Sequence, residues 1–504
     1  MGLTKTYKDG STPDIAIIGA GFSGICAAIR LQTQLGINNY RVFELEPDLG
    51  GTWWSNKYPG CACDIKSHNY SFSFEFNYEW SQEYATRTEI WEYIRKTAGK
   101  YDLYEKISFR TEITRVQWHE DRQKWVLDYV NLNNGQTDRM EADIVFSATG
   151  PLRIPQIPKE FESFEGPKWH TAQWDHSYDL TNKRVAVVGS GASAVQVVPS
   201  IVGKVKALEY YQRTASYIIP RKNNPYGPFW KWMFRNVPLF HSIYYKMVYW
   251  AGEGSHMVFS TKLKGSIPRT LISFAVWCFR YLHVRNKVLR KKLTPTYELG
   301  CRRIVVSSDY YPALTRKNVN VHTEAITSVK DKTLTLKDGS VQEVDVLILA
   351  TGFHTQNFIP KDFLIGKGGV DVMDMWEKGS GPQTYYGLTA PVTPNMFFLL
   401  GPNTALGHNS VLFMVEFQVE YAIKAISYMM EKNLRTLEVK EEAAKAFMDE
   451  TDRKMKSMVW STMCRSWYKN EQGKVTSLWW GTCSHYWWRL RHFHPARFTG
   501  VSRG

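Results

Sequence analysis

The segment DIAIIGAGFSGICAAIRLQ, residues 14–32, decides the fold of this chain. Its first apolar residues predict a buried strand, the Gly-x-Gly-x-x-Gly that follows predicts a tight turn, and the apolar periodicity beyond it predicts a helix. Gly19 would make the turn, Gly21 would let the backbone approach a pyrophosphate, and Gly24 would let helix and strand pack closely. The segment therefore predicts a dinucleotide site of the Rossmann type.

An acid follows the glycine turn at the distance that such a site requires. Glu44, at the end of the next predicted strand YRVFELE (40–46), comes about 20 residues after Gly24, where a carboxylate accepts hydrogen bonds from a ribose diol. Glu46 is the alternative acid at the same strand end. The helix N-terminus would offer its free N–H groups to the phosphates. This first unit predicts a site for FAD or NAD.

The same pattern returns in KRVAVVGSGASAVQVVPSI, residues 183–201, through Gly189, Gly191 and Ala194. The strand that follows, ALEYYQRT (207–214), carries Arg213 where the first unit carries its acid. An arginine cannot accept a hydrogen bond from a 2′-hydroxyl, but it can bind a 2′-phosphate. The second unit therefore predicts NADPH, and the first is then read as the FAD site.

The remaining pattern predicts an α/β fold with two Rossmann-like dinucleotide-binding domains, for FAD and NADPH, and a helical insertion. Two strands that run into Ala-Thr-Gly, at 142–150 and 344–352, are expected to close the two sheets. The insertion is predicted where aromatic residues fall at helical spacing, and its aromatic stripe is interpreted as core in preference to a substrate pocket. The predicted parts are the FAD-binding domain at 1–160, the NADPH-binding domain at 161–225, the helical insertion at 226–294, the second part of the NADPH-binding domain at 295–348, and the second part of the FAD-binding domain with the C-terminal tail at 349–504.

Composition narrows the classes of partner. Hydrophobic residues make up 43% of the chain and charged residues 22%, as in globular proteins. The net charge is +15, but Lys and Arg are dispersed without a nucleic-acid motif, so anionic cofactors are the expected partners and nucleic acid is not. The basic run 280–292 favours a solvated helix face, with membrane or partner contact as the alternative. The longest apolar run, 270–279, is too short to predict a transmembrane segment.

Cysteine and histidine usage predicts neither disulfides nor a metal site. The seven cysteines are scattered and form no C-x-x-C, which argues against a disulfide framework and a redox pair. Together with a polar N-terminus, this predicts a cytoplasmic protein. His170 and His176 have no further Cys or His nearby to complete a metal centre.

Two longer motifs carry a resemblance to a known family. GGTWWSNKYPGCACD (50–64) fits Gly-Gly-x-Trp-x4-Tyr-Pro-Gly-x3-Asp, and FEGPKWHTAQWDH (164–176) fits Phe-x-Gly-x3-His-x3-Trp-Asp. With the two dinucleotide turns, these patterns resemble type I Baeyer–Villiger monooxygenases, a branch of the flavin-containing monooxygenase superfamily. The stretches GPNT…GHNS (401–410) and CRSWYKN (464–470) look most like those of fungal members that tailor secondary metabolites. We interpret 164–176 as a connector between the two domains in which His170 and the tryptophans set domain orientation.

The resemblance implies two sets of cofactor contacts. Those to FAD are Gly19, Gly21, Ser23, Gly24, Glu44, Gly51, Trp53, Asp64 and Tyr70. Those to NADPH are Gly189, Gly191, Ala194, Arg213, Thr214, Arg302 and Arg303.

It also implies a reaction and its catalytic residues. The family's essential arginine corresponds to Arg303, next to Arg302; Asp64 would hold and modulate it, and Trp467 would lie on a loop that closes over NADP and substrate. The implied enzyme uses O2 to form a flavin C4a-peroxide and inserts one oxygen atom beside a ketone carbonyl, giving an ester or lactone. A fixed guanidinium stabilises the negative charge of such a reaction. The aromatic insertion suggests a large apolar ketone. Alternatives are oxygenation at nitrogen or sulfur, or a catalytically silent FAD-binding protein.

Overall fold

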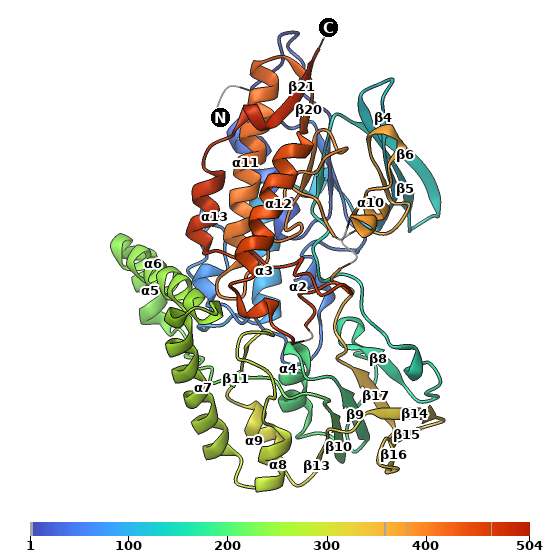
Figure 1. Cartoon of the computed structure of the whole chain (residues 1–504), viewed down its shortest axis with the longest axis vertical. Coiled ribbons are helices and arrows are strands. Elements are labelled where there is room, and N and C mark those ends of the chain that lie inside the picture. The colour runs from blue at the N-terminus through green and yellow to red at the C-terminus, as the bar shows by residue number, and fades with distance from the viewer. Residues whose placement is uncertain (1–3, 357–358, 380, 465, 504) are drawn as a thin grey trace.

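A computed structural model describes residues 4–356, 359–379, 381–464 and 466–503, and two parallel sheets organise it (Figure 1). The first sheet has the strand order β19-β7-β1-β2-β3. Ile15 pairs with Tyr40 on one side and with Ile144 on the other, so the first strand lies at the centre of the sheet. Its strands are β1 (Ile15–Ile18), β2 (Tyr40–Phe43), β3 (Ile107–Ser108), β7 (Ile144–Ser147) and β19 (Met396–Phe398).

The strand–turn–helix predicted from 14–32 is confirmed. Helix α1 (Phe22–Leu35) starts directly after the glycine turn. Residues 22–29 are all buried, and an exposed side appears only toward the C-terminal end of the helix. A Cβ at Gly24 would lie 1.9 Å from the carbonyl oxygen of Gly19, and Gly19 itself has φ +107°. Only glycine meets both conditions, because a side chain would force the helix off the strand and disfavour the turn. The glycines therefore determine how closely α1 approaches the sheet.

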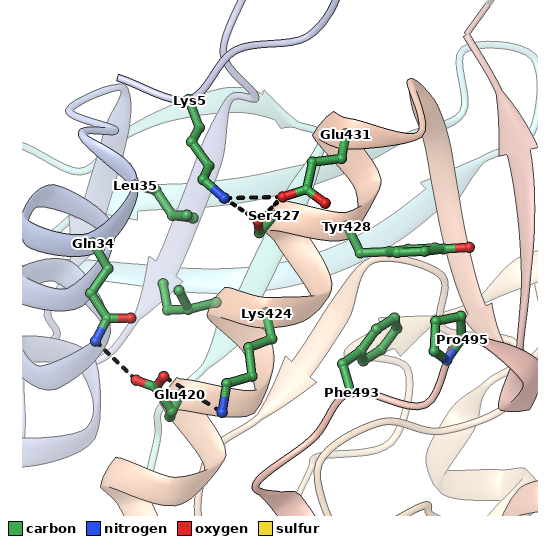
Figure 2. Close-up of a pocket in the computed structure, with 11 residues that line it drawn as sticks. Lys5, Gln34, Leu35, Glu420, Lys424, Ser427, Tyr428, Glu431, Phe493 and Pro495 are labelled. Atoms are coloured by element: carbon green, nitrogen blue, oxygen red, sulfur yellow. Dashed lines mark hydrogen bonds and ion pairs between the residues drawn. The ribbon is translucent and has the colours of Figure 1, made fainter. Parts of the chain in front are cut away.

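Helix α11 (Val411–Glu431) packs beside α1, although some 400 residues of chain separate their ends. Figure 2 shows the pocket at this junction and the polar side chains that cross it. Lys5 Nζ donates to Glu431 at 3.0 Å, and Gln34 Nε2 donates to Glu420 at 2.9 Å. These groups bond to one another across the pocket, which gives it a structural part in joining the N-terminal segment, α1 and α11.

The second sheet is also parallel, with the order β13-β10-β9-β17-β8. As predicted, each of the two Ala-Thr-Gly strands is part of one sheet. β7 pairs with β1 and β17 pairs with β9, the strands that lead into the two glycine turns. The segment 164–176 is more than the expected connector, since residues 168–170 form β8, the edge strand paired with β17. The strands are β8 (Lys168–His170), β9 (Arg184–Val188), β10 (Ala207–Tyr211), β13 (Val319–His322) and β17 (Val346–Leu349), and the associated helices are α4 (Ala192–Ile201) and α9 (Tyr310–Leu314).

Smaller elements complete both halves. An antiparallel sheet extends the first half, with β18 added parallel at its edge, and a three-stranded meander extends the second. The strands of these sheets are β4 (Thr111–His119), β5 (Lys124–Asn131), β6 (Gln136–Ala142), β18 (Leu364–Ile365), β14 (Ile326–Lys330), β15 (Thr333–Leu336) and β16 (Val341–Glu343), and two pairs are β11 (Ile218–Ile219) with β12 (Val305–Val306) and β20 (Leu434–Val439) with β21 (Phe498–Ser502). The further helices are α2 (Thr52–Ser55), α3 (Arg87–Lys100), α10 (Val372–Lys378), α12 (Glu441–Met455) and α13 (Cys483–Leu490).

Within the described residues, the chain crosses between the two halves in two places, and these crossings lie side by side. The amide of Gln156 donates to the carbonyl of Gly352 at 2.8 Å, and the amide of His354 donates to the carbonyl of Ile154 at 2.9 Å. Both crossings leave the end of an Ala-Thr-Gly strand. The two sheets are therefore connected by a short pair of hydrogen-bonded antiparallel segments.

The helical insertion is present, but the interpretation of its aromatic stripe as core is wrong for its outer face. The insertion consists of α5 (Pro228–Asn236), α6 (Pro238–Ser255), α7 (Leu263–His283) and α8 (Lys287–Lys292). Trp232, Trp250 and Phe274 are each more than half exposed. The helical period told which residues share a face, but not whether another element would cover it. Among the described residues, no helix is both long enough and apolar enough to span a bilayer.

Candidate functional site

Two glycine segments face each other at the start of α1. The Cα of Gly51 lies 3.6 Å from where a Cβ on Gly21 would stand. Gly21 is the N-cap of α1 and makes no side-chain cap, so the first N–H groups of the helix are open to an anion. Ser23 is buried in the first turn of the helix. The Gly-Gly of the 50–64 motif thus forms the second wall of a narrow, side-chain-free cradle that suits a pyrophosphate.

Glu44 lies at the edge of this cradle. Its carboxylate accepts from the amide of Ala20 at 2.7 Å and from the amide of Glu46 at 2.9 Å. Burial raises the pKa of Glu44, while these amide donors oppose the shift. The alternative acid, Glu46, instead accepts from Trp54 Nε1 at 3.2 Å. The geometry favours Glu44 for a ribose, because it is the acid that bonds to the glycine turn.

The second turn repeats the first in its backbone. Gly189 has φ +127°, and a Cβ there would stand 2.1 Å from the carbonyl oxygen of Ala350, whereas a Cβ on Gly191 would meet nothing within 4 Å. Ala194, at the third position of the motif, lies in the first turn of α4 and is fully buried. Space is therefore open at the N-terminus of α4, where a second dinucleotide would place its phosphates.

Arg213 and Thr214 follow β10 beside this turn. The hydroxyl of Ser190, within the turn, donates to the carbonyl of Thr214 at 2.8 Å, which holds the strand end against the glycines. Arg213 is exposed. Its guanidinium is thus available beside the turn, as binding of a 2′-phosphate requires.

The Tyr-Pro-Gly of the 50–64 motif contacts the other half of the protein. Tyr58 donates through its hydroxyl to Gln196 of α4 at 2.9 Å, and Gln196 donates back to the carbonyl of Ala62 at 2.9 Å. A Cβ on Gly60 would lie 2.2 Å from the hydroxyl of Ser200, also on α4. The motif therefore performs two tasks, since its first glycines line one dinucleotide turn and its last residues dock on the helix of the other.

Arg303 and Asp64 meet although 239 residues separate them. Arg303 donates to one Asp64 oxygen through Nε at 3.0 Å and Nη2 at 2.6 Å, and through Nη1 to the carbonyl of Leu406 at 3.0 Å. The Asp64 carboxylate raises the pKa of Arg303 above its usual value. With exposed side-chain fractions of 27% and 29%, the pair reaches solvent and keeps an accessible face. The cation is thus permanent and held in one orientation.

Aromatic residues lie around this pair. Trp53 donates through Nε1 to the hydroxyl of Tyr70 at 3.0 Å, and the two rings stand edge to face. Tyr468, which the sequence did not single out, is fully buried, and burial raises the pKa of its hydroxyl while the charge of Arg303 lowers it. Tyr468 therefore lies close enough to Arg303 for the charge of the guanidinium to act on its hydroxyl. In the sequence, the only indication that Tyr468 belongs near the site was its position directly after Trp467.

Trp467 and Arg302 make contacts of their own beside the Arg303–Asp64 pair. The carbonyl of Trp467 accepts from Thr355 and Gln356 at 2.9 and 2.8 Å, and its indole is 40% exposed. Arg302 turns its guanidinium over the ring of Tyr297, 4.8 Å from the centroid. Trp467 therefore sits on a surface segment tied to the second interdomain crossing.

A disulfide joins Cys301 to Cys464, which corrects the expectation drawn from the scattered cysteines. The two residues are 163 positions apart, and spacing along the chain carries no signal for such a pair. Cys301 directly precedes the Arg302–Arg303 pair, and Cys464 lies three residues before Trp467. The bond thus fastens the arginine segment to the segment that carries Trp467.

His170 ends β8 and faces the second crossing. Its ring lies edge to face with Phe353, 5.4 Å between centroids, and its Nδ1 accepts from the amide of Ala172. Burial lowers the pKa of His170 to about 4, so it is neutral at physiological pH. These contacts suit the proposed part of His170 in orienting the domains.

Two parallel sheets, each ending in a glycine turn beneath a helix N-terminus, define a two-dinucleotide flavoprotein of the oxidoreductase class. The family profile described as flavin-binding monooxygenase-like matches residues 12–364. A Baeyer–Villiger monooxygenase of Pseudomonas aeruginosa is 40% identical over 95% of this chain and 88% of that protein. An FAD-binding monooxygenase of Aspergillus niger is 32% identical over 94% of this chain and 79% of that protein.

Among solved structures, an oxidized steroid monooxygenase bound to NADP is 26% identical, with a TM-score of 0.84 over 97% of this chain and 99% of that one. This chain therefore belongs to the flavin-binding monooxygenase-like family, in its Baeyer–Villiger branch. It is an NADPH-dependent flavin monooxygenase with FAD and NADPH as cofactors, and the fold class predicted from the sequence is confirmed.

Proposed function

We propose that this enzyme oxygenates a large apolar ketone, in the cytoplasm and as a step of secondary metabolism, and that Arg303 is its essential active-site cation. The Arg303–Asp64 pair is the observation that carries the proposal. A two-point contact to one carboxylate oxygen and a third to a backbone carbonyl hold the guanidinium in place before substrate arrives. Preorganised charge of this kind is effective because it needs no rearrangement during the reaction.

Each of the two glycine turns would bind one cofactor. FAD, when bound and reduced by NADPH, would supply the electrons that activate O2, and one oxygen atom of that O2 would be transferred to the substrate. The Gly21–Gly51 cradle and Glu44 would hold its pyrophosphate and ribose, with Trp53 and Tyr70 beside them. Gly189, Gly191 and Ala194 would hold NADPH, with Arg213, Thr214 and Arg302 as further contacts.

Arg303 would stabilise the negative charge that develops on the carbonyl oxygen of the ketone. Asp64 would hold this guanidinium in place and moderate its charge, and Trp467 would cover NADP and substrate from the surface. The predicted domain boundaries at 160, 225, 294 and 348 are part of this proposal, because they place the arginine segment at the return from the insertion.

Product analysis tests the ketone chemistry directly. Purified enzyme supplied with NADPH and O2 should convert a panel of apolar cyclic and open-chain ketones to esters or lactones heavier by one oxygen atom. Each product should form with matching NADPH consumption. Oxidation of sulfides or amines without ester from any ketone would overturn the proposal in favour of heteroatom oxygenation, and background NADPH consumption with every substrate would favour a silent flavoprotein.

Arg213→Ala should convert the enzyme's preference from NADPH toward NADH. Among the described residues, the exposed guanidinium forms no hydrogen bond or ion pair, so the change should remove only its attraction for the 2′-phosphate. A charge-assisted contact of this kind contributes about 1.5–3 kcal/mol, so the Michaelis constant for NADPH should rise roughly tenfold or more. The constant for NADH should stay within about twofold, given that NADH lacks the phosphate. Steady-state kinetics with both nucleotides provides the measurement, and an equal rise for both would contradict the assignment.

A further inference from the structure

The helical insertion exposes one continuous apolar stripe along each of its two long helices. On α7, Ile267, Leu271, Phe274, Trp277 and Tyr281 recur at intervals of three and four residues, and all are between 46% and 65% exposed. Such spacing places them on one face of the helix. Phe274 stacks on Trp277, which in turn stacks on Tyr281, with centroids 5.9 and 5.1 Å apart. Among the described residues, the contact recorded for these rings from another helix is that of Arg290 of α8, whose guanidinium lies 4.1 Å from the centroid of Tyr281.

Helix α6 repeats this arrangement. Leu239, Ile243, Met247 and Trp250 are exposed by 58–73% and follow the same helical interval. On its opposite face, His241 packs edge to face against Phe76 at 4.6 Å, so the helix is already anchored to the protein on its inner side. More than half of the exposed large hydrophobic side chains among the described residues lie between 229 and 288. An apolar surface of this extent in a water-soluble protein marks an interaction site.

The inner face of α7 is equally well anchored. Val276 is buried, and Phe279 packs its ring against Tyr311 of α9 at 5.5 Å. Figure 1 shows α5 and α6 projecting from the same side of the molecule along which α7 runs. The outer stripes are therefore exposed even though the inner faces of both helices are packed against the rest of the protein.

The charged residues around the two apolar stripes indicate what kind of partner the surface would bind. The sequence from 228 to 294 contains twelve Lys and Arg but one acid, Glu253. That acid is buried, where it accepts from the amides of Cys483 and Ser484 at 3.0 and 2.8 Å. Among the described residues, no ion pair is formed by Lys246, Lys287 or Lys291. The insertion's own outer surface is thus apolar and cationic. The exposed acids that pair with it come from outside the insertion, namely Glu79 with Lys231 and Arg235, and Glu298 with Arg269.

We propose that α6 and α7 form a peripheral membrane-binding face that takes up an anionic lipid surface. Helices that lie in a bilayer interface bring aromatic and aliphatic side chains into the headgroup region and keep Lys and Arg for lipid phosphates. A second copy of this chain is a poor fit, since both copies would present the same positive charge. The proposal rests on this face alone and is independent of the ketone chemistry.

Vesicle flotation of the FAD-loaded protein tests the face. The protein should float with phosphatidylcholine vesicles that contain phosphatidylglycerol and stay in the soluble fraction with phosphatidylcholine alone. Leu271→Ser/Phe274→Ser/Trp277→Ser should lower the partition coefficient about tenfold or more by removing the inserted side chains. Lys287→Glu/Lys291→Glu should lower it similarly and weaken its dependence on salt.

A matched variant separates this face from general surface hydrophobicity. Leu132→Ser/Val341→Ser removes side chains that are 46% and 56% exposed, one in the turn after β5 and one in β16, and this variant should bind vesicles as the unaltered protein does. Wild-type protein that stays soluble with both vesicles would overturn the proposal, as would equal binding to both. Light scattering that shows a dimer lost in the triple variant would overturn it in favour of a protein interface.

Discussion

Arg303→Ala is expected to abolish oxygenation while FAD stays bound and remains reducible by NADPH. The substitution removes a cation whose pKa Asp64 raises and whose three contacts hold it in place. Loss of one preorganised donor to a developing oxyanion typically costs about 2.7–4 kcal/mol, and we expect at least this loss here. Product formation should therefore fall by at least about two orders of magnitude. Anaerobic bleaching of the flavin measures reduction, and ester yield measures oxygenation.

Controls distinguish loss of the cation from damage by an unpaired acid. Arg303→Ala leaves Asp64 partly buried without its partner, which could itself disturb the site. Arg303→Ala/Asp64→Ala removes both charges and should restore thermal stability without restoring ester formation. Arg303→Lys keeps the charge but loses the two-pronged contact, so it should retain only part of the activity. Ester formation by Arg303→Ala at the wild-type rate would remove this arginine from its assigned role.

Gly24→Ala is expected to prevent assembly of the FAD-binding half. The added Cβ would stand 1.9 Å from the backbone oxygen of Gly19, and neither backbone segment can move without separating α1 from β1. Overpacking at a rigid contact of this kind costs about 3 kcal/mol or more. Soluble yield, flavin content and melting temperature should all fall.

Gly21→Ala provides the matched control for this effect. Its Cβ would meet the Cα of Gly51 at 3.6 Å, an ordinary van der Waals contact. The fold should therefore persist with a near-normal melting temperature in the flavin-free state, while the methyl group fills the cradle and lowers FAD content. A Gly24→Ala protein with wild-type stability and flavin content would contradict the close-packing argument.

Local signals carried the prediction of both nucleotide-binding units. A strand, a glycine turn and a helix are encoded within twenty residues, and the positive φ of Gly19 and Gly189 shows why glycine stands there. The acid at Glu44 could be found by counting along the chain, although Glu46 remained possible. In the structure Glu44 accepts from an amide of the glycine turn and Glu46 accepts from Trp54, which supports the proposal that Glu44 binds the ribose.

The proposed catalytic pair, Arg303 and Asp64, was accessible only through resemblance. Nothing in the residues around Asp64 indicates a partner 239 positions away, because such contacts depend on how the two halves fold together. The Cys301–Cys464 bond and the docking of Tyr58 on Gln196 have the same origin. Tyr468 was missed for the same reason, since its burial beside Arg303 arises from tertiary packing.

The sequence by itself determined two dinucleotide-binding units, their cofactors, the helical insertion and the family, because these depend on short-range spacing and on long motifs. Only the tertiary structure decided which side chains meet at Arg303, that residues 168–170 complete a sheet edge, and that the aromatic stripe of the insertion faces outward. A helical period records which residues share a face. Whether that face is buried depends on elements distant in the chain, and along α6 and α7 none of the described elements covers it.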